Sequence, residues 1–389
     1  MPESLKPLAD PLPSCATCQA LTSRQAVEEL TDEWRAATRT GLHSGPFFQP
    51  EWCLATLDAF FPAAQPNFIA TRRESDRQLL GVLPLVRSRS IFKGMPLRSL
   101  RGPVSAHSCR ADFVAGGETL PIAARAVWDA LKADSWWQAI RFNDVLSEGA
   151  FRQIMRLAKE DGYPTANWRT RLSPTMQVTE PDPFVTCPKR YKSFRNRMKG
   201  KLQRLSEIAP VTFKVETSPG EETMKVFYAM ESSGWKGARG SAVASAPQTR
   251  QFYGSVWRSA AAHGYARVYS MHLGEKPIAM HFGLLRDGTY YTPKVTYDES
   301  YRDFSLGHLL MRHVIQDLAS AGAVQFDFLG PNAIWKSVWT TSLQRHDNCF
   351  IFRPTITGRA AHAALTQVGM RLRAIRHRLY GDPQDLEGK

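Results

Sequence analysis

The order of elements that residues 266–330 predict constrains the fold more than any other feature of this sequence. Alternating residues in "ARVYSMHLGEKPIAMHFGLLRDGTYYTPKVTY" (266–297) predict three successive strands with turns at 274–277 and 286–288. The run "SLGHLLMRHVIQDLASAG" (305–322) has apolar residues at helical spacing and a glycine at its end, which predicts a helix. "AVQFDFLG" (323–330) predicts one more strand. This order is typical of an α+β fold in which helices flank a mixed or antiparallel sheet.

The first half of the chain shows a similar order of predicted elements. Helices are expected from Thr22 and from near Pro50, a hairpin over 66–90, and a helix followed by a strand over 126–145. "LLGVLPL" (79–85) matches "PIAMHFGL" (277–284) in position, and "AIRFNDV" matches "AVQFDFL". We therefore expect a tandem duplication, with a disordered leader over 1–20, units over 21–185 and 186–355, and a basic C-terminal helix and tail over 356–389.

The segment "YRDFSLGHLL" (301–310) places a serine and a glycine where the predicted helix begins. The first amides of a helix are unpaired and carry partial positive charge, and a glycine allows an anion to approach them. Arg302, Ser305 and Gly307 therefore indicate a phosphate-binding turn. The alternative is an ordinary helix cap with an incidental glycine, because neither a P-loop nor Gly-x-Gly-x-x-Gly is present.

The formal net charge of +14 indicates an anionic partner, which could be nucleic acid, anionic lipid or a phosphate-bearing ligand. Eight basic residues and no acid lie between Lys189 and Arg204. As a helix, this segment is either a solvated amphipathic surface or a contact for a CoA phosphate, a carrier-linked phosphate or tRNA. The basic helix near the C-terminus either lies on an anionic membrane or covers the second unit. The predicted apolar face of the helix in "CPKRYKSFRNRMKGKLQRL" (187–205) holds Phe194, Met198, Leu202 and Leu205.

Neither a transmembrane helix nor a signal peptide is expected, because the chain has no run of 18 apolar residues and its N-terminus lacks an apolar core. The expected location is cytoplasmic, with peripheral contact at the inner face of the membrane as an option. Six cysteines include a single Cys-x-x-Cys pair, Cys15 and Cys18. No second pair completes a zinc site, so reduced thiols and no metal are expected.

The order of elements resembles that of the GNAT acyltransferases. A closer resemblance covers residues 189–339, about 40% of the chain, and is to the acetyltransferase-like domain of the CelD/BcsL cellulose-biosynthesis group, which is related to the FemAB peptidyltransferases. It is carried by "RNRMKGKLQRL", "GWKG", "KPIAMHFGL", "YTPKVTYDESYRDFSLGHLL" and "FDFLGPNAIWKSVW". The sequence departs from the family pattern at Leu306, where a proline is expected, and in its incomplete pyrophosphate motif. Two GNAT-like units lie side by side in Fem-type proteins, which agrees with the predicted duplication.

The resemblance implies a set of site residues. Lys336 would stabilise charge at the transferred carbonyl, Lys236 would face the substrate, and Trp235 would form a wall of the cleft. Asp327, a lone acid in an apolar strand, is either a general base or half of a structural ion pair. The residues expected to hold the donor are Lys294, Arg302, Ser305, Leu306, Gly307 and His308, and the remaining substrate contacts expected are His281, Tyr297 and Trp335.

The expected function is transfer of an acyl group from acetyl-CoA or another acyl-CoA to an amine or hydroxyl of a cell-envelope or polysaccharide-related acceptor. Two alternatives stay open. One is a Fem-like transferase that takes its donor from aminoacyl-tRNA, for which the basic helix over 189–204 would contact RNA. The other is a non-catalytic accessory factor of polysaccharide biosynthesis. Nucleic acid is a partner only in the tRNA alternative.

Overall fold

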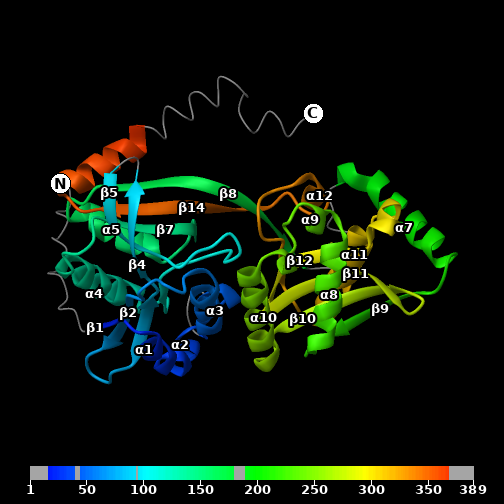
Figure 1. The fold of residues 1–389 in the computed structure, drawn as a ribbon, viewed down its shortest axis with the longest axis horizontal. Helices are drawn as coiled ribbons and strands as arrows, with labels where there is room; N and C mark the ends of the chain where they lie inside the picture. Colours follow the sequence, from blue (N-terminus) through cyan, green and yellow to red (C-terminus); the bar gives the residue numbers. More distant parts are fainter. Residues whose placement is uncertain (1–15, 40–43, 93–94, 179–188, 368–389) are drawn as a thin grey trace, which may run out of the picture.

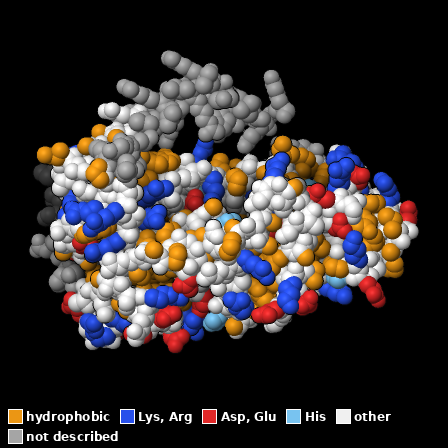
Figure 2. Space-filling model, viewed as in Figure 1, with side chains coloured by type: hydrophobic (Ala, Val, Ile, Leu, Met, Phe, Trp, Pro, Cys, Tyr) orange, Lys and Arg blue, Asp and Glu red, His pale blue; other side chains and the backbone are white. Residues whose placement is uncertain are grey.

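The computed structural model describes residues 16–39, 44–92, 95–178 and 189–367. The first half of the chain forms one lobe and most of the second half forms the other (Figure 1). Two long strands, β8 (Thr165–Gln177) and β14 (Leu343–Phe352), run side by side in the first lobe and point toward the second. On the face that Figure 2 shows, basic side chains are spread over both lobes. None of the helices in the described ranges is long and apolar enough to span a bilayer.

The first lobe begins with a four-stranded antiparallel sheet in the order β1-β2-β3-β6. The predicted leader is wrong in part, because residues 16–20 belong to a strand that pairs with β2; residues 1–15 lie outside the described ranges. The helix predicted from Thr22 is divided at Leu30 into two short helices, and the helix predicted near Pro50 is confirmed. The elements are β1 (Ala16–Leu21), α1 (Arg24–Glu29), α2 (Thr31–Ala37), η1 (Pro46–Phe48), α3 (Pro50–Phe60), β2 (Phe68–Arg73), β3 (Leu79–Leu83) and β6 (Val114–Ala115).

A ten-stranded sheet joins the two lobes in the order β4-β5-β7-β14-β8-β13-β12-β11-β10-β9. The N-terminal part of β8 pairs with β14, and its last residues pair with β13, so one strand connects both parts of the sheet. In the first lobe this sheet contains β4 (Val86–Phe92), β5 (Met95–Arg101) and β7 (Ala139–Leu146), which α4 (Leu120–Ala133) and α5 (Phe151–Glu160) cover. In the second lobe it contains β9 (Val211–Glu216), β10 (Ala266–Leu273), β11 (Lys276–Arg286), β12 (Thr289–Tyr297) and β13 (Gln325–Asp327).

Helices cover both faces of the second part of the sheet. On one face, α7 (Lys192–Ser206) and α11 (Leu306–Ser320) bury the apolar side chains of their inner surfaces. On the other face, α8 (Glu221–Ser233) and α10 (Pro247–Ala262) pack together with α3 of the first lobe in a single hydrophobic cluster. The three strands, the helix and the final strand predicted over 266–330 are confirmed. The α+β class is confirmed as well.

The predicted boundary between units, at residue 186, lies outside the described ranges and stays a prediction. Strand β14, which the prediction counted with the second unit, pairs on both sides with strands of the first half. The helix over 356–367 packs against the first lobe, so the expectation that it covers the second unit is wrong for these residues. Its Ala361 and Leu365 contact a cluster that includes Leu97 and Phe352. The rest of the predicted basic tail, 368–389, lies outside the described residues.

Candidate active site

A cavity of about 730 Å³ forms where two neighbouring strands separate. Strands β12 and β13 are parallel and pair only between residues 289–291 and 325–327. Beyond that point β12 continues to Tyr297, while the chain after β13 turns away, with positive φ angles of 49° at Leu329 and 59° at Gly330. The cavity lies between these diverging segments. Since it touches both α11 and α10, which cover opposite faces, it passes through the sheet.

The start of α11 forms one end of the cavity. Ser305 precedes the helix with a left-handed conformation (φ 55°), and residues 305–308 all line the cavity. The amides of Leu306 and Gly307 make no hydrogen bond with any described residue, whereas those of His308 and Leu309 bond to Ser305 O. A Cβ built on Gly307 would meet nothing within 4 Å. Unpaired amides beside open space at a helix N-terminus suit an anion, and binding of an anion here stays a prediction.

The basic helix α7 packs beside the start of α11. Its predicted apolar face is confirmed, because Phe194, Met198 and Leu205 are buried against the same core as α11. Lys201 projects from the helix and its Nζ donates to Ser305 Oγ at 2.7 Å. Ser305 therefore makes no side-chain cap to its own helix, contrary to one role expected for it. The contact places a lysine of α7 next to the free amides of α11 and adds positive charge there.

His308 presents a neutral imidazole to the cavity. Trp339 Nε1 donates to His308 Nδ1 at 3.2 Å, which assigns the ring proton of His308 to Nε2. Burial lowers the pKa of His308 to about 4, so the ring carries no charge near neutral pH. The imidazole can donate a hydrogen bond at this end of the cavity, but it is a weak proton acceptor there.

Lys336 belongs to the short helix α12 (Ile334–Ser337), which follows β13, and it lines the cavity across the strand gap from the start of α11. Its Nζ donates to the carbonyl oxygens of Leu329 and Pro331, the latter at 2.9 Å. Burial lowers the pKa of Lys336 to about 8, although the charge of Asp327 opposes this change. The Trp335 ring also lines the cavity, with its centroid 5.3 Å from Lys336 Nζ. Two carbonyls thus hold the ammonium in a fixed position, as a role in charge stabilisation requires.

Asp327 does not line the cavity but forms a buried ion pair with Arg110 of the first half. The residues are 2% and 5% exposed, and Asp327 Oδ1 also accepts from Leu329 N at 2.9 Å. The Arg110 guanidinium lies over the rings of Phe47 and Tyr291. Of the two roles expected for Asp327, the ion pair is the one that this geometry provides; its action as a general base stays a prediction. Sequence analysis did not identify Arg110.

Lys236 and Lys294 reach the cavity from the side of α8 and α10. Lys236 belongs to α9 (Trp235–Ala238), and its Nζ donates to Glu231 Oε1 at 3.0 Å and to Val295 O at 2.6 Å. Glu231, which sequence analysis also missed, is a buried carboxylate of α8. The side chain of Trp235 lies outside what the structure describes.

His281 does not reach the cavity. It is fully buried inside the sheet, where its Nε2 bonds to the Thr292 hydroxyl and its ring packs near Tyr290. Burial lowers the pKa of His281 to about 3. The expected cleft position of this histidine is therefore wrong, because alternation along β11 turns it into the core between the sheet and α11. Tyr297, in contrast, lines the cavity as expected.

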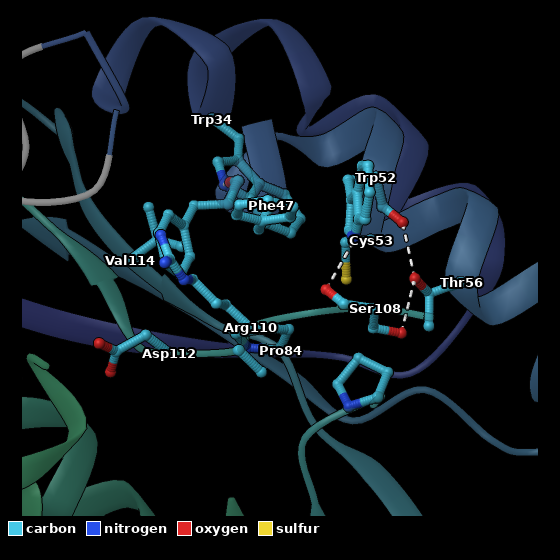
Figure 3. A pocket seen from close by; sticks show the side chains of 13 residues that line it. Trp34, Phe47, Trp52, Cys53, Thr56, Pro84, Ser108, Arg110, Asp112 and Val114 are labelled. Atoms are coloured by element: carbon cyan, nitrogen blue, oxygen red, sulfur yellow. Dashed lines mark hydrogen bonds between the residues drawn. The ribbon is translucent and has the colours of Figure 1, made fainter. Parts of the chain in front are cut away.

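A loop of the first half lines the cavity on the face of α10. Trp52 Nε1 donates to Ser108 O at 3.1 Å and the Thr56 hydroxyl lies 3.4 Å from Ser108 Oγ (Figure 3). These contacts from α3 fix the loop so that His107 and Cys109 line the cavity. The void drawn in Figure 3 has only about 20 Å³, which is room for a single water. The contribution of the first half had no sequence signal that we identified.

Basic side chains dominate the charged lining of the cavity. None of the described residues that line it is an aspartate or a glutamate, whereas five are lysine or arginine. Among the described residues, no group of three or more His, Cys, Asp or Glu side chains could hold a metal ion. The lining therefore suits a negatively charged ligand. Its cations are Arg171, Lys236, Lys294, Arg302 and Lys336.

Comparisons with known proteins agree with this fold. Residues 192–337 match the family described as "Acetyltransferase (GNAT) domain". The crystal structure of FemX superposes with a TM-score of 0.57 at 12% identity, covering 82% of this chain and 95% of that one. The C-terminal domain of a putative lysylphosphatidylglycerol synthetase from Agrobacterium fabrum gives 0.52 at 12% identity, covering 88% and 96%. L-PGS from Bacillus licheniformis gives 0.51 at 12% identity, covering 89% and 96%.

No curated protein sequence matches the chain. At 12% identity the structural likeness concerns the fold and not the activity of these proteins. The second half of the chain contains a GNAT domain, and the two lobes together have a Fem-like fold, as the sequence resemblance implied.

Proposed function

We propose that this protein transfers an acyl group from an acyl-CoA to an amine or hydroxyl of a cell-envelope or polysaccharide-related acceptor. One observation carries the proposal: a single cavity extends from the free amides of α11, through the gap between β12 and β13, to the buried ammonium of Lys336. A GNAT domain supports acyl transfer as the reaction type. The nature of the acceptor rests on the resemblance to the CelD/BcsL group.

The residues at the start of α11 fit the pyrophosphate of an acyl-CoA. The amides of Leu306 and Gly307 have no hydrogen-bond partner in the described part of the chain, and the space beside Gly307 is open. Arg302 lines the cavity and Lys201 donates a hydrogen bond to Ser305, so both side chains add positive charge near these amides. When bound, the donor supplies a thioester, whose carbonyl carbon is open to attack by an amine or hydroxyl. The helix N-terminus would hold its phosphates and so fix the position of that carbonyl.

Lys336 is the residue that we assign to charge stabilisation. In the reaction, a bond forms between the acceptor nitrogen or oxygen and the thioester carbon, negative charge develops on the carbonyl oxygen, and the carbon–sulfur bond then breaks. A preorganised ammonium lowers the barrier because it needs no reorientation as the charge develops. The acceptor loses one proton, and the departing thiolate gains one.

His107 is the group best suited to take the acceptor's proton. It lines the cavity on the face of α10, and its Nδ1 lies 3.5 Å from the Tyr253 hydroxyl. Burial is the main cause that lowers the pKa of His107, and the charge of Lys294 adds to it. The ring is therefore neutral near pH 7 and can accept a proton directly or through a water.

Calorimetry with CoA, acetyl-CoA and a long-chain acyl-CoA tests the donor, and release of free thiol in the presence of amine or hydroxyl compounds tests the reaction. Binding of CoA together with acceptor-dependent thiol release is the expected result. Steeply salt-dependent binding of aminoacyl-tRNA without binding of CoA would favour aminoacyl transfer instead. Binding of CoA without turnover for any acceptor would favour a non-catalytic role.

A further inference from the structure

The cavity ends, on the face of α8 and α10, in a site that both halves of the chain build. Lys294 enters this end from β12, Lys236 from α9 and Tyr253 from α10. His107 and Cys109 complete it from the loop of the first half. The free amides of α11 lie on the opposite face of the sheet. This end is therefore separate from the place where the donor phosphates fit.

One buried carboxylate serves both lysines of this end. Glu231 Oε1 lies 3.0 Å from Lys236 Nζ and 4.0 Å from Lys294 Nζ, and Glu231 Oε2 accepts from Val243 N at 2.7 Å. The Lys236 ammonium also donates to Val295 O. Glu231 is 1% exposed, so it lies behind the lysines and not in the cavity. A single carboxylate compensates one of the two ammonium groups, which leaves an excess of positive charge.

Lys294 carries the uncompensated part of that charge. Within the described part of the chain its Nζ makes no hydrogen bond, and the side chain is only 14% exposed although it lines the cavity. The nitrogen lies over the Tyr253 ring, 5.1 Å from the centroid. Burial is the main cause that lowers the pKa of Lys294. Lys294 is half-buried and lines the cavity, and its ammonium has hydrogen-bond donors that no described acceptor uses, so an anion would complete this end.

The other groups at this end supply no negative charge near neutral pH. Burial raises the pKa of the Cys109 thiol to about 11 and raises the pKa of Tyr253 well above its ordinary value. His107 is neutral for the reason given above. Arg171 is compensated separately, since its Nη1 lies 3.5 Å from Asp144 Oδ2. An anionic ligand would supply the negative charge that these side chains do not.

We propose that the acceptor carries an anionic oxygen group, a phosphate or a carboxylate, that binds Lys294 and Lys236 at this end of the cavity. This inference deepens the proposed function and rests on it. The oxyanion would form charge-assisted hydrogen bonds with the two ammonium groups. The acceptor's amine or hydroxyl would then lie between this end, where His107 can take its proton, and the thioester carbon in the gap beside Lys336.

The test uses the full-length protein saturated with CoA, so that the start of α11 is occupied. Two matched pairs of probes are titrated by calorimetry: glycerol 3-phosphate against glycerol, and glucuronate against glucose. We expect an acidic probe to bind at least about tenfold more tightly than its uncharged partner. Lys294→Gln should remove that preference and leave the affinity for CoA unchanged, and Glu231→Gln should raise the affinity for the acidic probe severalfold. Lys225→Gln, an exposed lysine of α8, is the matched control and should change nothing.

The outcomes separate this inference from the proposed function. If the wild-type protein does not bind CoA, the proposed function fails, and the same titration without CoA still tests the anion site. If CoA binds but acidic and uncharged probes bind equally, or no acidic probe binds up to about 20 mM, this inference alone is overturned. Loss of CoA affinity in Lys294→Gln would move Lys294 to the donor site and would also overturn it. A preference for phosphate or for glucuronate tells which oxyanion the acceptor carries.

Discussion

Replacing Gly307 with alanine should affect folding and donor binding in opposite directions. Gly307 lies in the first turn of α11, its φ is outside the left-handed region, and a Cβ placed on it would meet nothing within 4 Å. Alanine is favoured over glycine in a helix by up to about 1 kcal/mol. The free energy of unfolding of Gly307→Ala should therefore stay the same or rise by a fraction of that amount.

The same methyl group would occupy the space through which an anion approaches the free amides of Leu306 and Gly307. Hydrogen bonds to charged groups contribute about 1.5–3 kcal/mol each. Loss of one such bond should weaken CoA binding about 10- to 150-fold. The larger Gly307→Glu should abolish binding, since it adds both bulk and negative charge.

Urea denaturation measures the stability of each variant and calorimetry with CoA measures the affinity. Gly200→Ala in α7 is the matched control, because a Cβ on that helical glycine also meets nothing within 4 Å and Gly200 does not line the cavity. It should retain full affinity for CoA. A Gly307→Ala protein that binds CoA as tightly as the wild type would refute the assignment of the donor phosphates to α11.

Four further predictions concern the charged residues around the cavity. Burial lowers the pKa of Lys336 to about 8, so the ammonium form is lost above that pH and kcat/KM should fall as pH rises through about 8. Lys336→Met should be slow at all pH values and should lack this decline. The unfolded lysine keeps its proton to higher pH, so the wild type should also gain stability relative to Lys336→Met above about pH 8, which urea denaturation at several pH values would detect. Asp327→Asn leaves the Arg110 charge buried and unpaired, and it should lower the free energy of unfolding by about 3–5 kcal/mol. The double variant Arg110→Met with Asp327→Leu should recover most of that loss. Unchanged stability of Asp327→Asn with a greatly reduced rate would instead support Asp327 as a general base. Lys201→Met should weaken CoA binding about 3- to 10-fold, because the positive charge next to Ser305 is lost. Lys199→Met, on the exposed side of the same helix, is the control and should leave CoA binding unchanged. Equal effects of the two variants would show that only net charge matters.

Sequence patterns predicted the part of the site that a continuous segment builds. The start of α11 came from a local signal, a glycine at the start of an apolar-periodic helix. The structure places five residues of this segment in the cavity wall: Arg302, Ser305, Leu306, Gly307 and His308. Lys236, Lys294, Trp335 and Lys336 line it as the resemblance implied. The first strand was missed because residues 16–21 have weak alternation and gain their stability from pairing with β2.

Contacts between distant parts of the chain could not be predicted in this way. Arg110 and Asp327 are 217 positions apart, and nothing near either residue marks the other as its partner. His107 reaches the cavity only because α3 holds its loop, and Glu231 matters only because α8 places it beside two lysines.

The sequence by itself determined the kind and order of the local elements and the glycine-containing start of α11, because helical and strand periodicity and helix-end chemistry depend on neighbouring residues. Tertiary structure alone decided that β14 would return to the first lobe, that β12 and β13 would separate to open a cavity, and that basic but no acidic side chains among the described residues would line it. These features depend on how the chain brings remote segments together, and the charge balance of a site is a property of all the segments that enclose it.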